Sequence, residues 1–210
     1  MKILKNFPVT GKYNKSISTD LCFNQTNKQK PLVILCHGYK GYKDWGAFDI
    51  MSSNFLKANM AFLKFNFSHN GGTPNQPIDF PDLEAFGNNN YTKELDDLEC
   101  IINWICTTTK FKNEIDTNNI TLIGHSRGGS IAIIKAAEDA RIKKLVTWAA
   151  VSDLDRTMFH EGAELDKWKE DGVLYILNGR TKQKMQHYIQ FYDNFIKNKK
   201  RLSVENAAKK

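Results

Sequence analysis

Short apolar runs alternate with longer amphipathic segments along most of the chain. Residues 31–38 (PLVILCHG) form a continuous apolar run that ends in glycine, which is typical of a strand buried on both faces. Comparable runs at 61–67, 119–126 and 143–153 predict three further strands. The alternating stretch 15–23 predicts one more strand ahead of them.

Segments with helical spacing lie between these runs, at 45–60, 89–109 and 127–140. The segment 89–109 has an apolar stripe, and Thr92 is predicted as its N-cap. The stripe consists of Leu95, Leu98, Ile101, Ile102 and Ile105. Strands that alternate with helices predict βα units, hence an α/β fold with a mainly parallel sheet and helices on both faces.

The pattern weakens after residue 153. Residues 172–186 are consistent with a short hairpin and 187–198 with a helix. We therefore predict a core at 1–153, a small cap or lid insertion at 154–200 and a basic C-terminal tail at 201–210.

The composition indicates one ordinary globular domain of 210 residues, with 41% hydrophobic residues and a net charge of +7. Most of that charge lies at one end, because residues 197–210 hold six basic residues and one acidic residue. A short basic end is usually a solvated segment, so we expect neither a nucleic-acid nor a membrane partner.

The four cysteines show no CxxC pair and no spacing with histidine that suggests a metal site. No signal-like segment and no 18-residue apolar run is present in the sequence. These features predict a reduced, cytoplasmic protein without a bound metal. The cysteines are Cys22, Cys36, Cys100 and Cys106.

A serine stands between a predicted strand and a predicted helix, in GHSRG at 124–128. This sequence fits Gly-x-Ser-x-Gly, the sharp turn that presents a nucleophilic serine to substrate. Small neighbours avoid clashes within the turn, and the helix directs its free N–H groups at the reaction centre. The motif predicts Ser126 as a nucleophile and the N–H of Arg127 as an oxyanion donor.

A second oxyanion donor is predicted where the strand 31–38 ends in His-Gly. The N–H of Tyr39 follows Gly38, and glycine permits a close backbone approach to substrate. Two such donors stabilise the negative charge that develops on an attacked carbonyl.

Four stretches together resemble the α/β-hydrolase family, especially a bacterial branch related to serine aminopeptidases and dienelactone-hydrolase-like enzymes. They are LVILCHGYKGYKDWGAF, FLKFNFSHNGG, ELDDL and TLIGHSRGG, and the resemblance spans about residues 15–200. It implies cleavage of an ester, thioester or amide of a small acyl substrate through an acyl-enzyme on Ser126. It also implies that neither a metal nor an organic cofactor takes part.

The same resemblance places an acid and a histidine after the serine, on loops that follow two further strands. No such strands follow in this sequence. Several other residues are alternative acids or bases. His69 is instead predicted to line the pocket. The Asp96–Asp97 pair is predicted to lie on a solvated helix face, with one of the two residues packed against a neighbouring loop. The alternatives are Asp153, Asp155, His160 and His187, followed by His37 and His125.

Two explanations fit this pattern. We expect that the chain is the N-terminal portion of a longer protein, whose remainder supplies the strands, the acid and the histidine. The alternative is a degenerate, non-catalytic protein that keeps the fold for binding. Aromatic and apolar residues of 154–200 either line a moderately apolar substrate pocket or pack the cap onto the core; they are Met158, Phe159, Trp168, Tyr175, Phe191 and Tyr192.

Overall fold

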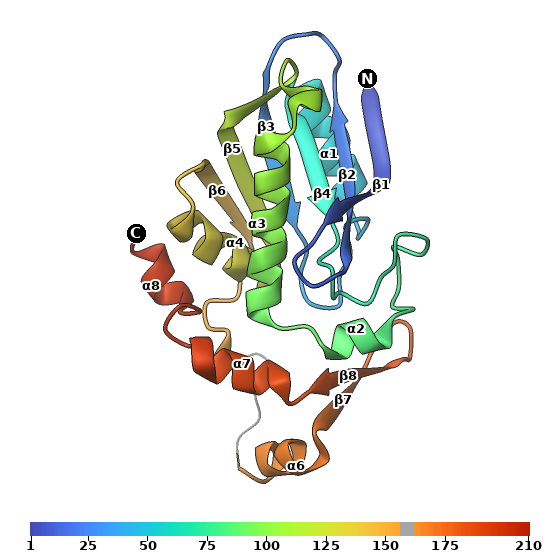
Figure 1. The fold of residues 1–210 in the computed structure, drawn as a ribbon, viewed down its shortest axis with the longest axis vertical. Coiled ribbons are helices and arrows are strands. Elements are labelled where there is room, and N and C mark those ends of the chain that lie inside the picture. Colours follow the sequence, from blue (N-terminus) through green and yellow to red (C-terminus); the bar gives the residue numbers. More distant parts are fainter. Residues whose placement is uncertain (156–161) are drawn as a thin grey trace.

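The computed structural model describes residues 1–155 and 162–210 and contains a six-stranded sheet with the strand order β1-β2-β4-β3-β5-β6 (Figure 1). β1 and β2 are antiparallel to their neighbours, whereas β4, β3, β5 and β6 run parallel. The strands are β1 Lys2–Thr10, β2 Ser16–Phe23, β3 Lys30–Cys36, β4 Ala61–Phe65, β5 Ile115–His125 and β6 Ile142–Trp148. The mainly parallel α/β sheet predicted from the sequence is confirmed.

Helices cover both faces of the sheet because the central strands are apolar on both sides. On one face, α1 (Phe48–Lys57) packs against a small cluster that includes Val33 and Phe62. On the other face, α3 (Tyr91–Thr107) and α4 (Arg127–Glu138) cover the main core. Two short helical elements flank α3 in the chain, α2 Leu83–Gly87 and the 3-10 turn Thr109–Phe111.

Helix α3 buries the whole of its predicted apolar stripe. Its N-cap is Asn90 and not Thr92, since the Asn90 side chain accepts a hydrogen bond from the Lys93 N–H at 3.0 Å. The backbone of Asn90 is extended, as a cap requires, whereas Thr92 already lies in the first turn. The Thr92 hydroxyl instead donates to the Asn90 side-chain oxygen.

The segment predicted as a cap contains α6 (Ala163–Asp171), the antiparallel hairpin of β7 (Val173–Leu177) and β8 (Lys184–Tyr188), and α7 (Gln190–Asn198). The predicted hairpin and helix are therefore confirmed. The hairpin lies near α2, at the end of the molecule where β3 and β5 terminate (Figure 1).

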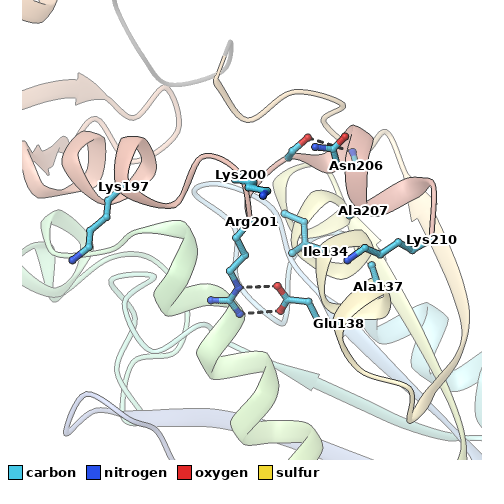
Figure 2. Close-up of a pocket in the computed structure, with 10 residues that line it drawn as sticks. Ile134, Ala137, Glu138, Lys197, Lys200, Arg201, Asn206, Ala207 and Lys210 are labelled. Carbon is cyan, nitrogen blue, oxygen red and sulfur yellow. Dashed lines mark hydrogen bonds and ion pairs between the residues drawn. The ribbon is translucent and has the colours of Figure 1, made fainter.

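The segment predicted as a basic tail carries a short helix, α8 (Val204–Ala208), that packs against α4. Leu202 and Val204 are buried, while Arg201 forms a two-pronged ion pair with Glu138 at 2.7 and 2.9 Å (Figure 2). The predicted basic tail is thus a folded segment that packs on the core.

Strand β6 forms one edge of the sheet, and no strand follows it in the sheet within residues 1–155 and 162–210. This edge exposes Leu145, Val146 and Trp148 by 38%, 43% and 42%. Among the helices that the structure describes, none is long and apolar enough to cross a membrane.

Candidate active site

Ser126 occupies the sharp turn between β5 and α4, with a backbone φ of 54° and ψ of −126°. This conformation is strained for a residue with a side chain. The Ser126 N–H donates to the carbonyl of Trp148 at 2.8 Å, and the Gly129 N–H donates to the Ser126 carbonyl at 2.9 Å. Strand β6 and the first turn of α4 therefore hold the serine in place.

The glycines around Ser126 lie where no side chain fits. A Cβ on Gly124 would lie 2.5 Å from the Gly128 carbonyl oxygen, and one on Gly128 would lie 2.3 Å from the His37 carbonyl oxygen. A Cβ on Gly129 would lie 2.6 Å from the Cβ of Ala150. The elbow pattern in the sequence thus reflects backbone packing on both sides of the serine.

The loop after β3 reaches the same point. A Cβ on Gly38 would lie only 2.9 Å from the Ser126 Cβ, so this loop passes directly beside the serine. The N–H of Tyr39 donates to no acceptor in the described part of the chain. The N–H of Arg127, the first of α4, has no acceptor within the helix. The structure thus brings Ser126 together with both residues predicted as oxyanion donors.

A pocket of about 230 Å³ opens in front of Ser126. Its walls come from the loop after β3, from His125 and from the turn of the β7–β8 hairpin. The hairpin turn contributes Asn178, Gly179 and Arg180, which the sequence did not suggest as site residues. The only available signal was the turn-forming Asn-Gly pair inside the predicted hairpin.

The side chain of Arg127 turns back into the core behind the serine. It donates to Oε1 of Glu94 at 2.7 Å, and the same oxygen accepts from the Asn89 side chain at 2.7 Å. Its guanidinium carbon lies 4.6 Å from the ring centroid of Tyr39. Burial raises the pKa of Glu94, and the positive charge of Arg127 opposes that rise.

His187 lies close to the site, but its side chain contacts Tyr39 and not Ser126. Its Nε2 is 2.7 Å from the hydroxyl of Tyr39, and its ring packs against Phe86 and Phe191. Burial lowers the pKa of His187 to about 3, so the ring is neutral at ordinary pH. Because Nε2 is engaged by Tyr39, this histidine links the cap to the loop and is not placed as a base for Ser126.

His37 lines the pocket and has both ring nitrogens engaged. Nδ1 is 2.9 Å from the Gly38 carbonyl oxygen, and the Phe67 N–H donates to Nε2 at 3.2 Å. Burial lowers the pKa of His37 to about 4. This histidine therefore holds the backbone of the loop after β3 in place, while His125 also lines the pocket.

His69 does not line this pocket, contrary to the prediction. Its Nδ1 is 2.7 Å from the Ser68 hydroxyl, and its ring lies against Tyr13 instead. The loop after β4 turns toward the N-terminus of α3, where Oδ2 of Asp97 accepts from the Ser68 N–H at 2.7 Å. The predicted contact between the Asp96–Asp97 pair and a neighbouring loop is thus confirmed, and burial raises the pKa of Asp97 to about 7.

Asp153 and Asp155 do not line the pocket in front of Ser126. Asp155 pairs with Lys199 at 2.5 Å, and Asp153 accepts a hydrogen bond from the Asp155 N–H at 3.0 Å. His160 lies outside the described residues. The hydroxyl of Ser126 makes no hydrogen bond to any residue that the structure describes.

None of the described aromatic residues predicted at the cap lines the pocket at Ser126, and three of the four pack against the main core. Trp168 and Phe191 are buried in the main core, and the Trp168 indole donates to the His187 carbonyl at 2.9 Å. Tyr192 is partly buried against the same core, whereas Tyr175 is 56% exposed. Met158 and Phe159 lie outside the described residues.

A larger pocket, of about 450 Å³, lies between α4, the end of α7 and α8 (Figure 2). Basic side chains surround it, among them Lys197, Lys200 and Lys210, but it offers no elbow serine or close oxyanion loop. Within residues 1–155 and 162–210, no group of three or more His, Cys, Asp or Glu side chains is arranged to hold a metal ion. The candidate active site is therefore the pocket at Ser126.

Comparison with known proteins identifies the same architecture. A family model described as alpha/beta hydrolase fold matches residues 31–210. An uncharacterized 31.7 kDa protein from the traX-finO intergenic region of Escherichia coli is 26% identical over 144 residues. That match covers 69% of this chain and 46% of the relative, so the chain spans about half the length of the curated relatives it matches.

Solved structures share the fold at low sequence identity. The complex of DcsB with its substrate analogue has a TM-score of 0.67 at 16% identity, over 97% of this chain and 76% of that one. Est1E from Butyrivibrio proteoclasticus, solved with ferulic acid, has a TM-score of 0.65 at 18% identity, over 97% and 71% of the two chains. A putative hydrolase from Agrobacterium vitis has a TM-score of 0.68 at 15% identity, over 94% and 73%.

Proposed function

Because this chain belongs to the α/β-hydrolase fold family, we propose that it is a serine hydrolase that cleaves an ester, thioester or amide of a small acyl substrate. The observation that carries the proposal is the strained backbone of Ser126 at the strand-to-helix turn, beside the loop that holds Gly38 and Tyr39. Similar structures whose names include a putative hydrolase and an alpha/beta hydrolase support the same reaction class.

The chemistry follows from the positions of these groups. The Ser126 oxygen attacks the acyl carbonyl, its proton passes to a base, and the carbonyl oxygen becomes negative. The N–H groups of Tyr39 and Arg127 stabilise that oxygen, and each such donor contributes roughly 10²–10³-fold to the chemical step. The alcohol, thiol or amine then leaves with a proton, and water releases the acyl group from the serine.

One observation favours a second candidate function, a non-catalytic binding protein of the same fold. The Ser126 hydroxyl makes no hydrogen bond to a histidine or carboxylate among the described residues. A serine without such a base is a weak nucleophile. The two candidates share the pocket and differ in whether Ser126 reacts.

A fluorophosphonate probe distinguishes them. The purified chain is incubated with the probe, and the site of modification is located by mass spectrometry, together with turnover of p-nitrophenyl acetate. We expect labelling at Ser126 and turnover, both lost in Ser126→Ala. Ser53→Ala is the matched control, because Ser53 is exposed on α1 and lies outside the pocket.

Equal turnover in the wild type and in Ser126→Ala, with no labelled serine, would contradict the hydrolase proposal for this chain. Substrate binding in the pocket without reaction would instead support the binding protein. Neither result changes the assignment of the fold, which rests on the sheet topology and the family match.

A further inference from the structure

The pocket in front of Ser126 is basic. Of the described residues that line it, two have basic aliphatic side chains, Lys40 and Arg180, and none is an aspartate or a glutamate. Burial lowers the pKa of His37 to about 4, so this ring is neutral at ordinary pH. The lysine and arginine side chains at the pocket are therefore those of Lys40 and of Arg180, which also pairs with Asp79 outside the lining.

Lys40 belongs to the oxyanion loop, directly after Tyr39. Its Nζ lies 4.9 Å from the centroid of the Tyr39 ring, and it forms no ion pair with any residue in the described part of the chain. Partial burial lowers the pKa of Lys40. A partly desolvated ammonium without a carboxylate partner gains from an anion brought in by a ligand.

Arg180 approaches the pocket from the other side, at the turn of the β7–β8 hairpin. The side-chain oxygen of Asn178 accepts the Arg180 N–H at 3.0 Å and the Thr181 N–H at 3.2 Å, which sets the turn. The guanidinium lies near the ring of Trp45 and donates to Asp79 at 2.5 Å. Because a guanidinium has five N–H donors, this single bond leaves a fork available for a carboxylate.

Lys40 and Arg180 line the same pocket as Ser126 and come from two different elements. We infer that the Ser126 pocket takes acyl groups that end in a carboxylate, with that carboxylate held by Lys40 and Arg180 while Ser126 attacks the carbonyl. The inference rests on the proposed hydrolase function and adds the substrate class. A pocket of about 230 Å³ restricts the acyl chain to a short one.

Two fluorophosphonate probes of equal length test the inference, one ending in a carboxylate and the other in a primary amide. At low salt, we expect the carboxylate probe to label Ser126 about three- to tenfold faster than the amide probe. The ratio should fall toward one at 1 M salt and in the double variant Lys40→Gln, Arg180→Gln. Lys184→Gln is the matched control, because Lys184 is exposed on β8 outside the pocket.

The outcomes separate the two claims. A ratio of one or less in the wild type, with normal labelling by the amide probe, would overturn the carboxylate inference and leave the hydrolase proposal standing. Labelling of Ser126 by neither probe would contradict the hydrolase proposal. In that case, calorimetry compares the affinity of the protein for monomethyl glutarate with its affinity for the amide analogue, and this comparison tests the carboxylate inference. Tighter binding of the acid, lost in the double variant, supports the inference, and equal binding overturns it.

Discussion

The guanidinium carbon of Arg127 lies 4.6 Å from the centre of the Tyr39 ring. These two residues come from different segments of the chain, yet they carry the two N–H groups proposed to form the oxyanion hole. Their side chains therefore contact one another, while the backbone at Gly38 passes beside Ser126. Glu94 holds the guanidinium from α3 at 2.7 Å, which links the main core to this arrangement.

Replacing Arg127 by Met should lower the free energy of unfolding by about 3–5 kcal/mol, because Glu94 would remain buried without its partner. Urea denaturation measures this change. The double variant Arg127→Met, Glu94→Leu removes both charges, so we expect it to be more stable than the single variant. Additive losses in the double variant would show that the pair is not coupled.

Replacing Tyr39 by Phe removes the hydroxyl that is 2.7 Å from Nε2 of His187. The buried imidazole loses a partner, so we expect a loss of about 1–3 kcal/mol in the free energy of unfolding. The N–H of residue 39 remains, and the rate at which a fluorophosphonate labels Ser126 should change less than threefold. Tyr175→Phe, at an exposed position, is the control and should change neither quantity.

The sequence predicted the parts of this molecule that depend on local pattern. Apolar runs and helical spacing predicted the central strands and helices, and the glycines around Ser126 predicted the elbow. Strand β1 was not predicted because the register of its pairing shifts between Leu4 and Phe7, which interrupts the alternation. Local pattern identifies an element only where that pattern is regular.

The parts that the sequence did not predict depend on contacts between distant segments. Tyr39 and His187 are 148 residues apart, and Arg127 and Glu94 are 33 apart. The prediction for His69 was wrong because the loop after β4 turns toward α3, a direction that its composition does not indicate. Arg180 reaches the pocket only because the cap folds back over the end of the sheet.

Gly128→Ala should disrupt the elbow, because a Cβ there would lie 2.3 Å from the His37 carbonyl oxygen, a backbone atom that cannot rotate away. We expect a loss of several kcal/mol of stability, on the order of 2–4, or failure to fold. Gly179→Ala is the matched control, since a Cβ at that position meets nothing within 4 Å. Thermal unfolding compares the two, and equal midpoints would contradict the packing argument.

His187 should make the protein less stable as the pH falls. Its pKa in the folded protein is about 3, against an ordinary value of 6.5, so between these values the unfolded chain binds a proton that the folded chain does not. The free energy of unfolding therefore decreases as the pH falls from 6.5, by at most about 1.4 kcal/mol per pH unit from this residue.

His187→Gln removes that contribution, while its amide can still accept from the Tyr39 hydroxyl. Urea denaturation at several pH values between 7.5 and 4.5 should give a shallower slope for the variant. Asp97, whose pKa is raised to about 7, acts in the opposite direction in both proteins and cancels from the comparison. Parallel slopes would show that His187 is not buried in its neutral form.

The exposed edge of β6 should promote association between copies of the chain. Val146 is 43% exposed on this edge, where unpaired backbone groups and apolar side chains lie together. Val146→Lys places a charge there, so we expect less concentration-dependent association in light scattering or sedimentation, with a stability change within about 0.5 kcal/mol. Ile50→Lys, at a 66% exposed position on α1, makes the same chemical change away from the edge. If both variants reduce association equally, the effect comes from net charge, and the edge of β6 is not the contact.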